Sequence, residues 1–229
     1  MAHIHLEDGA FSPEWILIWS AIAAGILTLA LYLLNRQIVS GRRIAIAAMC
    51  AAVGIAVFMI EVPTPLGPVH LSLTPLIGVL AGPLLGSLVA LVVNAFSAAI
   101  GHGGWGMIGA NSIVSITEVV LGYYTFRLLR RRLGVDLFWA GFASSMIALT
   151  AGALVVMFIV SVSGIQGSSL TREEIFANTL LLGAVNIAAG VLEAFVAGYI
   201  VTFIARVRPD LIGEPIPRKE VRTMTQPGG

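Results

Sequence analysis

The chain has 229 residues, of which 58% are hydrophobic and 11% charged, and its mean hydropathy is +0.95. This balance excludes an ordinary soluble domain, and the net charge of +1 gives no case for nucleic-acid binding. Apolar runs long enough to cross a bilayer recur, so we predict an all-α polytopic membrane protein. Residues 1–208 would form a single transmembrane domain, followed by a polar, proline-rich cytoplasmic tail at 209–229.

The first apolar run, residues 15–34, differs from a cleavable signal peptide. A signal peptide carries a basic segment before its apolar one, whereas Glu7, Asp8 and Glu14 precede this run with no Lys or Arg. We therefore expect this run to stay in the membrane. The native amino terminus would then survive, apart from removal of Met1 by processing.

Further apolar runs predict helices over residues 44–60, 112–126, 137–163 and 175–205. Between them, residues 71–100 would reach about 45 Å as one helix, well beyond the hydrocarbon core. Gly82 and Pro83 interrupt this run. Because glycine ends helices and proline begins them, the run fits either one broken helix or two helices joined by a tight turn.

The positive charges decide between these topologies. Of the 13 Lys and Arg residues, twelve fall in three segments, at 36–43, at 127–132 and from Arg206 onward. All twelve face the cytoplasm only if residues 71–100 cross the membrane twice. We therefore predict about seven transmembrane helices, with the amino terminus outside and the carboxyl terminus in the cytoplasm. The helix over 71–81 is short for a full span, so it would tilt or begin inside the protein.

This topology places all four histidines in external segments: His3, His5, His70 and His102. The external loops also hold Glu61 and the glycine-rich stretch GHGGWGMIGAN, which ends at Asn111. The external face is therefore the predicted site of chemistry.

Two carboxylates lie in the middle of predicted helices, Glu118 and Glu193. Asn111 and Asn186 each precede one of them by seven residues, which is two helical turns, so each pair shares a helix face. Two readings stay open. These side chains hydrogen-bond neighbouring helices, or they line a path for a transported ion.

The amino terminus has the donor pattern of a small chelator. If Met1 stays, the amine, two backbone amides and the His3 imidazole supply four nitrogens. If Met1 is removed before Ala2, three nitrogens remain and one position is open, for which His70 is the natural candidate. Square-planar nitrogen sites favour Ni(II) or Cu(II), with Co(II) also accommodated.

Other residues suit supporting roles around such a site. Asp8 and Glu61 could orient an imidazole from the outer shell. Enzymatic motifs are missing from the sequence, which has no HExxH, no GxSxG and no GxxxxGK[ST], and its one lysine is Lys219. The chain is therefore not expected to be an enzyme or to hydrolyse ATP.

Three motifs together resemble one family. His5 to Gly9 matches a His-x-x-Asp-Gly signature, PVHLSLTPLIGVLAGP matches a histidine loop that contains His70, and GHGGWGMIGAN matches a glycine loop. Over residues 3–208 the chain resembles the CbiM/NikM family, the substrate-binding membrane components of cobalt and nickel energy-coupling factor transporters.

The resemblance implies that an external amino terminus folds back into a seven-helix bundle and holds a divalent ion. The implied donors are the terminal amine, the amide and imidazole of the second residue, and a histidine in the loop before the third helix. The metal residues are then Met1, Ala2, His3, His5 and His70. Spacing from Asp-Gly selects His5, whereas distance from a processed terminus selects His3, and both stay open.

His102 is predicted to act as a gate or outer-shell residue, as is Asn111, and a structural role for His102 is equally compatible. The resemblance also implies partners, namely a coupling transmembrane subunit and two ATP-binding cassette ATPases, in a prokaryotic cytoplasmic membrane. Ni(II) or Co(II) would be cargo, with no prosthetic group. The expected docking residues are small side chains of the second helix: Ala47, Ala48, Ala51 and Ala52.

Two rival functions use the same sequence features. The chain could be a membrane metal sensor or scaffold that binds without transporting. It could also be an intramembrane enzyme that uses Glu118 and Glu193.

Overall fold

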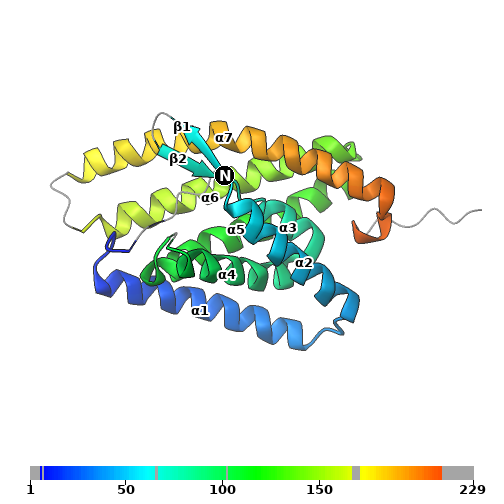
Figure 1. Ribbon diagram of the computed structural model, residues 1–229, viewed down its shortest axis with the longest axis horizontal. Helices are drawn as coiled ribbons and strands as arrows, with labels where there is room; N and C mark the ends of the chain where they lie inside the picture. Colours follow the sequence, from blue (N-terminus) through cyan, green and yellow to red (C-terminus); the bar gives the residue numbers. More distant parts are fainter. Residues whose placement is uncertain (1–5, 7, 65–66, 102, 167–170, 213–229) are drawn as a thin grey trace, which may run out of the picture.

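The computed structural model describes the chain except for residues 1–5, 7, 65–66, 102, 167–170 and 213–229 (Figure 1). Seven α-helices make up most of the described part: α1 (Pro13–Asn35), α2 (Gly41–Phe58), α3 (Thr74–Ala81), α4 (Pro83–Ala99), α5 (Ile108–Arg131), α6 (Leu137–Ser163) and α7 (Arg172–Val207). Two short 3-10 turns accompany them, η1 (Trp105–Met107) and η2 (Pro209–Leu211).

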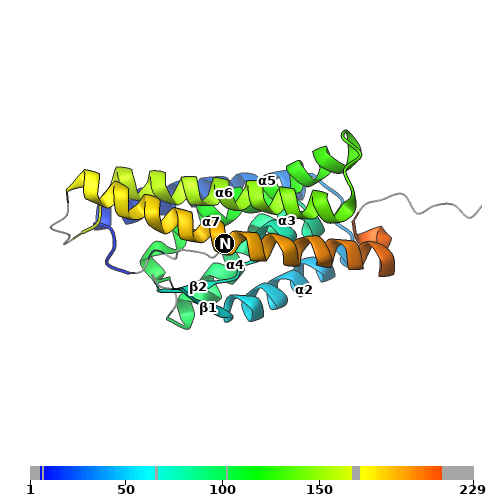
Figure 2. The ribbon, with the colours of Figure 1, turned by 90° about the horizontal axis from the view of Figure 1, so that it is seen from above.

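The helices form an elongated bundle in which most run along its long axis (Figures 1 and 2). The order of contact is α7 on α6, α6 on α5, and α5 on α3, α4 and α1. Helix α5 therefore lies in the centre of the bundle. This arrangement confirms the predicted all-α fold.

One element was not predicted, a hairpin of β1 (Glu61–Thr64) and β2 (Gly67–His70) between α2 and α3. The strands are antiparallel, and their register pairs Glu61 with His70 and Pro63 with Pro68. Proline has no N–H to give to a ladder, so a ten-residue stretch with three prolines is read as a loop. Here Pro63 and Pro68 face each other, and the pairs on either side complete the hairpin.

The break at Gly82 and Pro83 is confirmed, and it makes two helices. Gly82 has a φ of +83°, and its N–H donates to the Gly78 carbonyl oxygen at 2.9 Å. Such a φ suits glycine, and Pro83 then begins α4 with a backbone that has no N–H to satisfy.

Five of the described helices have the length and apolar composition of a membrane span, and α4 is apolar but has only 17 residues. Helix α3 has eight residues, and all but Leu80 are buried. It therefore begins and ends inside the bundle, as one of the two sequence-based alternatives expected. Large apolar side chains cover the outside, for example Leu17, Met49 and Phe203, which are 65–70% exposed.

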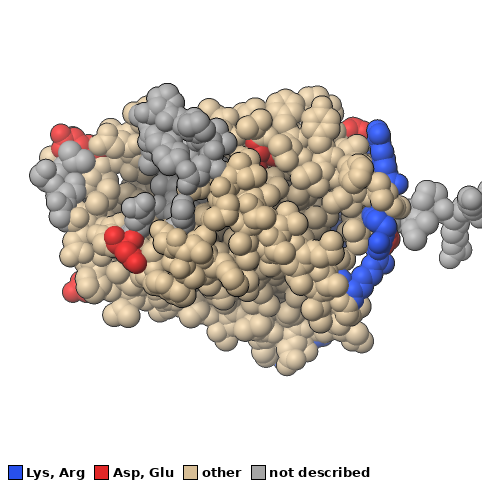
Figure 3. Space-filling model, in the orientation of Figure 1, with Lys and Arg blue, Asp and Glu red and all other residues tan. Residues whose placement is uncertain are grey.

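Arginine side chains gather at one end of the bundle, on the right in Figure 3. Arg42 and Arg43 at the start of α2 share a pocket there with Arg127 and Arg131 near the end of α5. Two of the predicted positive segments thus meet at one end, and Arg208 at the start of the third lies there too, since it shares Asp210 with Arg42. Their assignment to the cytoplasmic side stays a prediction.

The first residues of the expected tail pack back on the bundle. Asp210 in η2 forms an ion pair with Arg42, and Ile212 packs against the apolar cluster around Phe126. The domain prediction placed residues 209–212 in the tail. In the structure, Asp210 and Ile212 contact the helices. The tail from residue 213 lies outside the described residues.

The predicted docking alanines divide between two faces of α2. Ala47 is buried against α3 and α4, whereas Ala48 and Ala52 are exposed and Ala51 is half-buried. Ala47 packs within the chain and cannot contribute to a docking face. The docking prediction therefore rests on Ala48 and Ala52.

Glycines let α3 and α4 approach α5 closely, Gly78 on α3 and Gly86 on α4. A Cβ at Gly78 would overlap the backbone carbonyl oxygen of Val119, and one at Gly86 would lie 2.7 Å from Val119 Cγ1. A backbone atom cannot rotate away as a side chain can. The Gly78 contact is therefore the tighter constraint.

We expect Gly78→Ala to lower the free energy of unfolding by about 1–3 kcal/mol, because the added methyl group must push α3 away from α5. Thermal unfolding in detergent would measure this as a lower midpoint. Gly25→Ala on α1 is the matched control, because a Cβ there meets nothing within 4 Å. Equal midpoints for the two variants would contradict the close approach.

Candidate metal site

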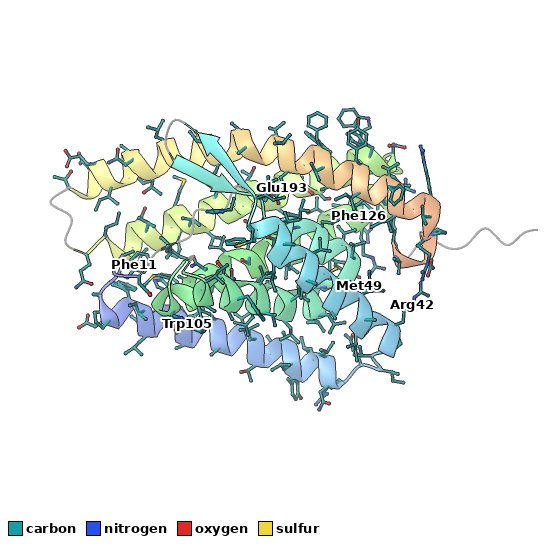
Figure 4. All side chains as sticks on the ribbon, in the orientation of Figure 1. Phe11, Arg42, Met49, Trp105, Phe126 and Glu193 are labelled. Atoms are coloured by element: carbon teal, nitrogen blue, oxygen red, sulfur yellow. The ribbon has the colours of Figure 1, made fainter. Side chains whose placement is uncertain are left out.

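The described part of the amino-terminal segment, Leu6 and residues 8–12, packs into one end of the bundle. Leu6 and Phe11 are 7% and 1% exposed and belong to a cluster with Met107 and Val114. The Ala10 carbonyl oxygen accepts a 2.9 Å hydrogen bond from the Gln166 amide. Phe11 and Trp105 mark this end in Figure 4, opposite Arg42.

Asn111 holds the backbone of this segment. Its Oδ1 accepts from the Leu6 amide at 3.2 Å, and its Nδ2 donates to the Leu6 carbonyl oxygen at 3.3 Å. The same Nδ2 donates to the Gly103 carbonyl oxygen at 3.2 Å. One side chain on α5 thus fixes both the amino-terminal segment and the glycine loop.

Asp8 makes the second link between these two segments. Its carboxylate oxygens accept from the backbone amides of Trp105, at 3.1 Å, and Gly106, at 2.8 Å. A Cβ at Gly104 would overlap this carboxylate, which explains a glycine with a φ of +55° there. The described contacts of Asp8 therefore anchor the segment to η1, a role that differs from orienting an imidazole.

Strand β2 ends near the middle of the bundle's long axis (Figure 1), and His70 is its last residue, before the chain turns into α3. Its ring stacks on Phe58 of α2 with 5.2 Å between centroids and 10° between planes. The hairpin register brings the backbone of Glu61 opposite His70. An outer-shell role for Glu61 remains a prediction.

Glu193 on α7 reaches the turn that follows His70. Its carboxylate accepts from the Ser72 amide at 3.2 Å, the Ser72 hydroxyl at 3.0 Å and the Leu73 amide at 2.7 Å. Figure 4 shows Glu193 near the middle of the bundle. This contact could not be inferred from the sequence, because the partners lie more than 100 residues apart.

Glu118 on α5 lies at the same turn. Its side chain lies beside Thr74, the first residue of α3, and packs so tightly on α6 that a Cβ at Gly152 would overlap the carboxylate. Both Glu118 and Glu193 are 0% exposed. The contacts of Glu193 agree with the hydrogen-bonding reading of this carboxylate.

The remaining predicted metal residues, Met1, Ala2, His3 and His5, lie outside the described residues, as does His102. Within the described ranges no three His, Cys, Asp or Glu side chains cluster in a way that could hold a metal ion. His70 is the predicted ligand that the structure describes.

The sequence has relatives that match it over most of its length. A cobalt transport protein CbiM of Kyrpidia tusciae is 24% identical over 91% of this chain and 86% of its own length. Two archaeal relatives carry provisional names. Cobalt transport protein CbiM 1 of Methanocorpusculum labreanum is 26% identical over 91% of this chain and 92% of its own length. Fused nickel transport protein NikMN of Archaeoglobus fulgidus is 26% identical over 91% of this chain and 68% of its own length.

The fold also has a solved counterpart. A crystal structure of a transition metal transporter superposes with a TM-score of 0.76 at 20% identity, over 89% of this chain and 93% of that one. The family profile described as the cobalt uptake substrate-specific transmembrane region, CbiM, matches residues 5–211. This match covers the bundle, the amino-terminal anchor and the His70 loop, and the chain belongs to the CbiM family.

Proposed function

We propose that this chain is the substrate-binding membrane subunit of an importer for Co(II) or Ni(II). The observation that carries the proposal is the pair of hydrogen bonds between the Asn111 side chain and the backbone of Leu6, a buried residue. We call this pair the Asn111 clamp. Five residues precede Leu6, and five residues extend at most about 17 Å. The terminal amine and the amino-terminal histidines therefore start from a fixed point within the bundle that also holds His70.

The proposed ligand set is the terminal amine, a backbone amide and imidazole near the terminus, and the His70 imidazole. These are nitrogen donors, which suit Ni(II) and Co(II). Both His3 and His5 stay candidates for the amino-terminal imidazole. Most of the relatives' names specify cobalt and one specifies nickel, so we include both ions.

Transport would need energy from partners, since the chain has no GxxxxGK[ST] phosphate loop. We propose a coupling membrane subunit and two ATP-binding cassette ATPases in the cytoplasmic membrane, with the arginine-rich end inside. Ala48 and Ala52 are exposed small residues on α2 and suit close helix contact with the coupling subunit.

The alternative is a membrane sensor or scaffold that binds the ion without moving it. Uptake of radioactive Ni(II) and Co(II) by cells that carry or lack this chain, together with its partners, separates the two. Transport predicts accumulation that depends on the chain. Metal binding by the purified chain without such accumulation would favour the sensor.

We expect His70→Phe to abolish high-affinity binding of Ni(II) and Co(II), because phenylalanine keeps the stack on Phe58 but has no nitrogen ligand. Isothermal titration of the purified chain would measure the binding. His70→Ala, which also removes the stack, should bind equally poorly and unfold at a lower temperature. Retained affinity in His70→Phe would exclude His70 as a ligand.

Two alanines placed before Met1 should weaken binding strongly, because the amine moves away from the imidazole and the amides of the chelate change. The matched control carries the same two alanines after Gly229 and should bind normally. Metal analysis of both purified proteins measures the difference. Equal metal content would rule out the amine as a ligand.

Asn111→Leu should raise the apparent dissociation constant about tenfold or more. The substitution removes the partners of the Leu6 amide and carbonyl, at about 1–3 kcal/mol for each buried group, and 1.4 kcal/mol is tenfold. If the amino-terminal segment is docked on the bundle for a smaller fraction of the time, its apparent affinity for the metal ion falls in proportion. Asn178→Leu, at an exposed position on α7, is the control. Unchanged affinity in Asn111→Leu would contradict a role for the clamp.

A further inference from the structure

Helix α3 begins inside the bundle with a residue that cannot cap it. Its N-cap is Leu73, which has no side-chain hydrogen bond to offer, and the next residues, from Thr74 to Val79, are buried. A helix start leaves backbone amides without partners in the helix. In an apolar bundle those amides, and the ones just before them, need acceptors from elsewhere.

Glu193 provides such an acceptor from α7. Its carboxylate takes the Ser72 amide, the Ser72 hydroxyl and the Leu73 amide, at 2.7–3.2 Å. Hydrogen bonds from backbone amides to a carboxylate are stronger than those to a neutral acceptor. A negative charge is also favourable at the amino-terminal end of a helix.

The turn that Glu193 holds is strained. Leu73 has φ +51° and ψ +23°, and within the described ranges no other residue except glycine has a positive φ. Leucine avoids this conformation because its Cβ crowds the backbone, and it persists only where surroundings enforce it. Here the short bond from the Leu73 amide to Glu193 enforces it, together with burial of the Leu73 side chain beside Leu76 and Phe126.

His70 lies two residues before Ser72, so this turn sets the direction in which the chain leaves His70. We propose that Glu193 is a positioning residue for His70: by holding the strained turn at Leu73, it keeps the imidazole in the orientation that binds metal. The proposal rests on the proposed function, since it assumes that His70 is a ligand. It gives a buried carboxylate on α7 a role in metal affinity without direct contact with the ion.

The test uses the full chain, purified in lipid nanodiscs and titrated with Ni(II). In Glu193→Gln, an NH2 group replaces one accepting oxygen and faces amide donors. Residues that orient a metal ligand typically contribute 10- to 100-fold to affinity, and we expect a loss of about that size. The visible ligand-field spectrum at saturating Ni(II) should also change, because His70 no longer completes the nitrogen set.

The strain allows a sharper comparison. Glycine adopts a positive φ without cost, so in a Leu73→Gly background the turn depends less on Glu193. The loss caused by Glu193→Gln should therefore be clearly smaller in that background than in the natural chain. In each background we compare the dissociation constants with and without Glu193→Gln. The effect of the cavity left by Leu73→Gly is then present in both values and cancels in their ratio.

Thr179→Val is the matched control on α7, because this buried hydroxyl bonds only the carbonyl of Ile175 on its own helix among the interactions described. It should leave affinity and spectrum unchanged. If Glu193→Gln does not fold, Ser72→Ala removes a single bond to the carboxylate, and we expect a smaller loss of about two- to tenfold.

An unchanged affinity, an unchanged Ni(II) spectrum or an equal loss in both backgrounds would overturn the positioning role. Metal binding by the natural chain distinguishes a failure of this inference from a failure of the proposed function. If the natural chain binds neither Ni(II) nor Co(II), the proposed function fails, whereas normal binding in the natural chain and in Glu193→Gln refutes only the inference.

Discussion

The structure depends on one constraint: helix α3 begins in the apolar interior, where backbone amides cannot be left without acceptors. A full span would carry its ends to water, but eight residues cannot. Glu193 meets this need from α7 by accepting from the Ser72 and Leu73 amides, which ties α7 to the turn before α3. Irregular backbone at this depth is tolerated only where protein groups satisfy it. The chain around His70 can therefore leave helical geometry while it remains inside the bundle.

Much of the fold could be predicted because it follows from local signals. Apolar runs gave the long helices, and Gly82 and Pro83 marked the break that the structure confirms. The hairpin was missed because three prolines in this stretch indicate a loop, although the strands pair around Pro63 and Pro68. The burial of Ala47 within the chain could not be predicted from the sequence either. Small residues at a four-residue spacing predict a close contact but cannot tell a partner in the same chain from one in another.

The candidate site was predictable in its residue types and less so in its connections. Asn111 was singled out as a gate, and its contact with both groups of the Leu6 backbone could not be inferred, since 105 residues separate them. Asp8 was expected near an imidazole because carboxylates often orient histidines. In the structure it meets the amides of η1, which compete well for a carboxylate at a helix start.

The anchors of the two proposed ligand segments lie on different helices. Asn111 on α5 holds the amino-terminal segment, and Glu193 on α7 holds the turn after His70. Helix α6 packs against both α5 and α7, so it fixes the distance between the anchors. Under the proposed function, a bound ion joins ligands from these two anchors and is most stable at one spacing of α5 and α7. Any partner that shifts α7 relative to α5 would then weaken the site without touching the ion. This gives a coupling subunit on the bundle's outer surface a physical route to release.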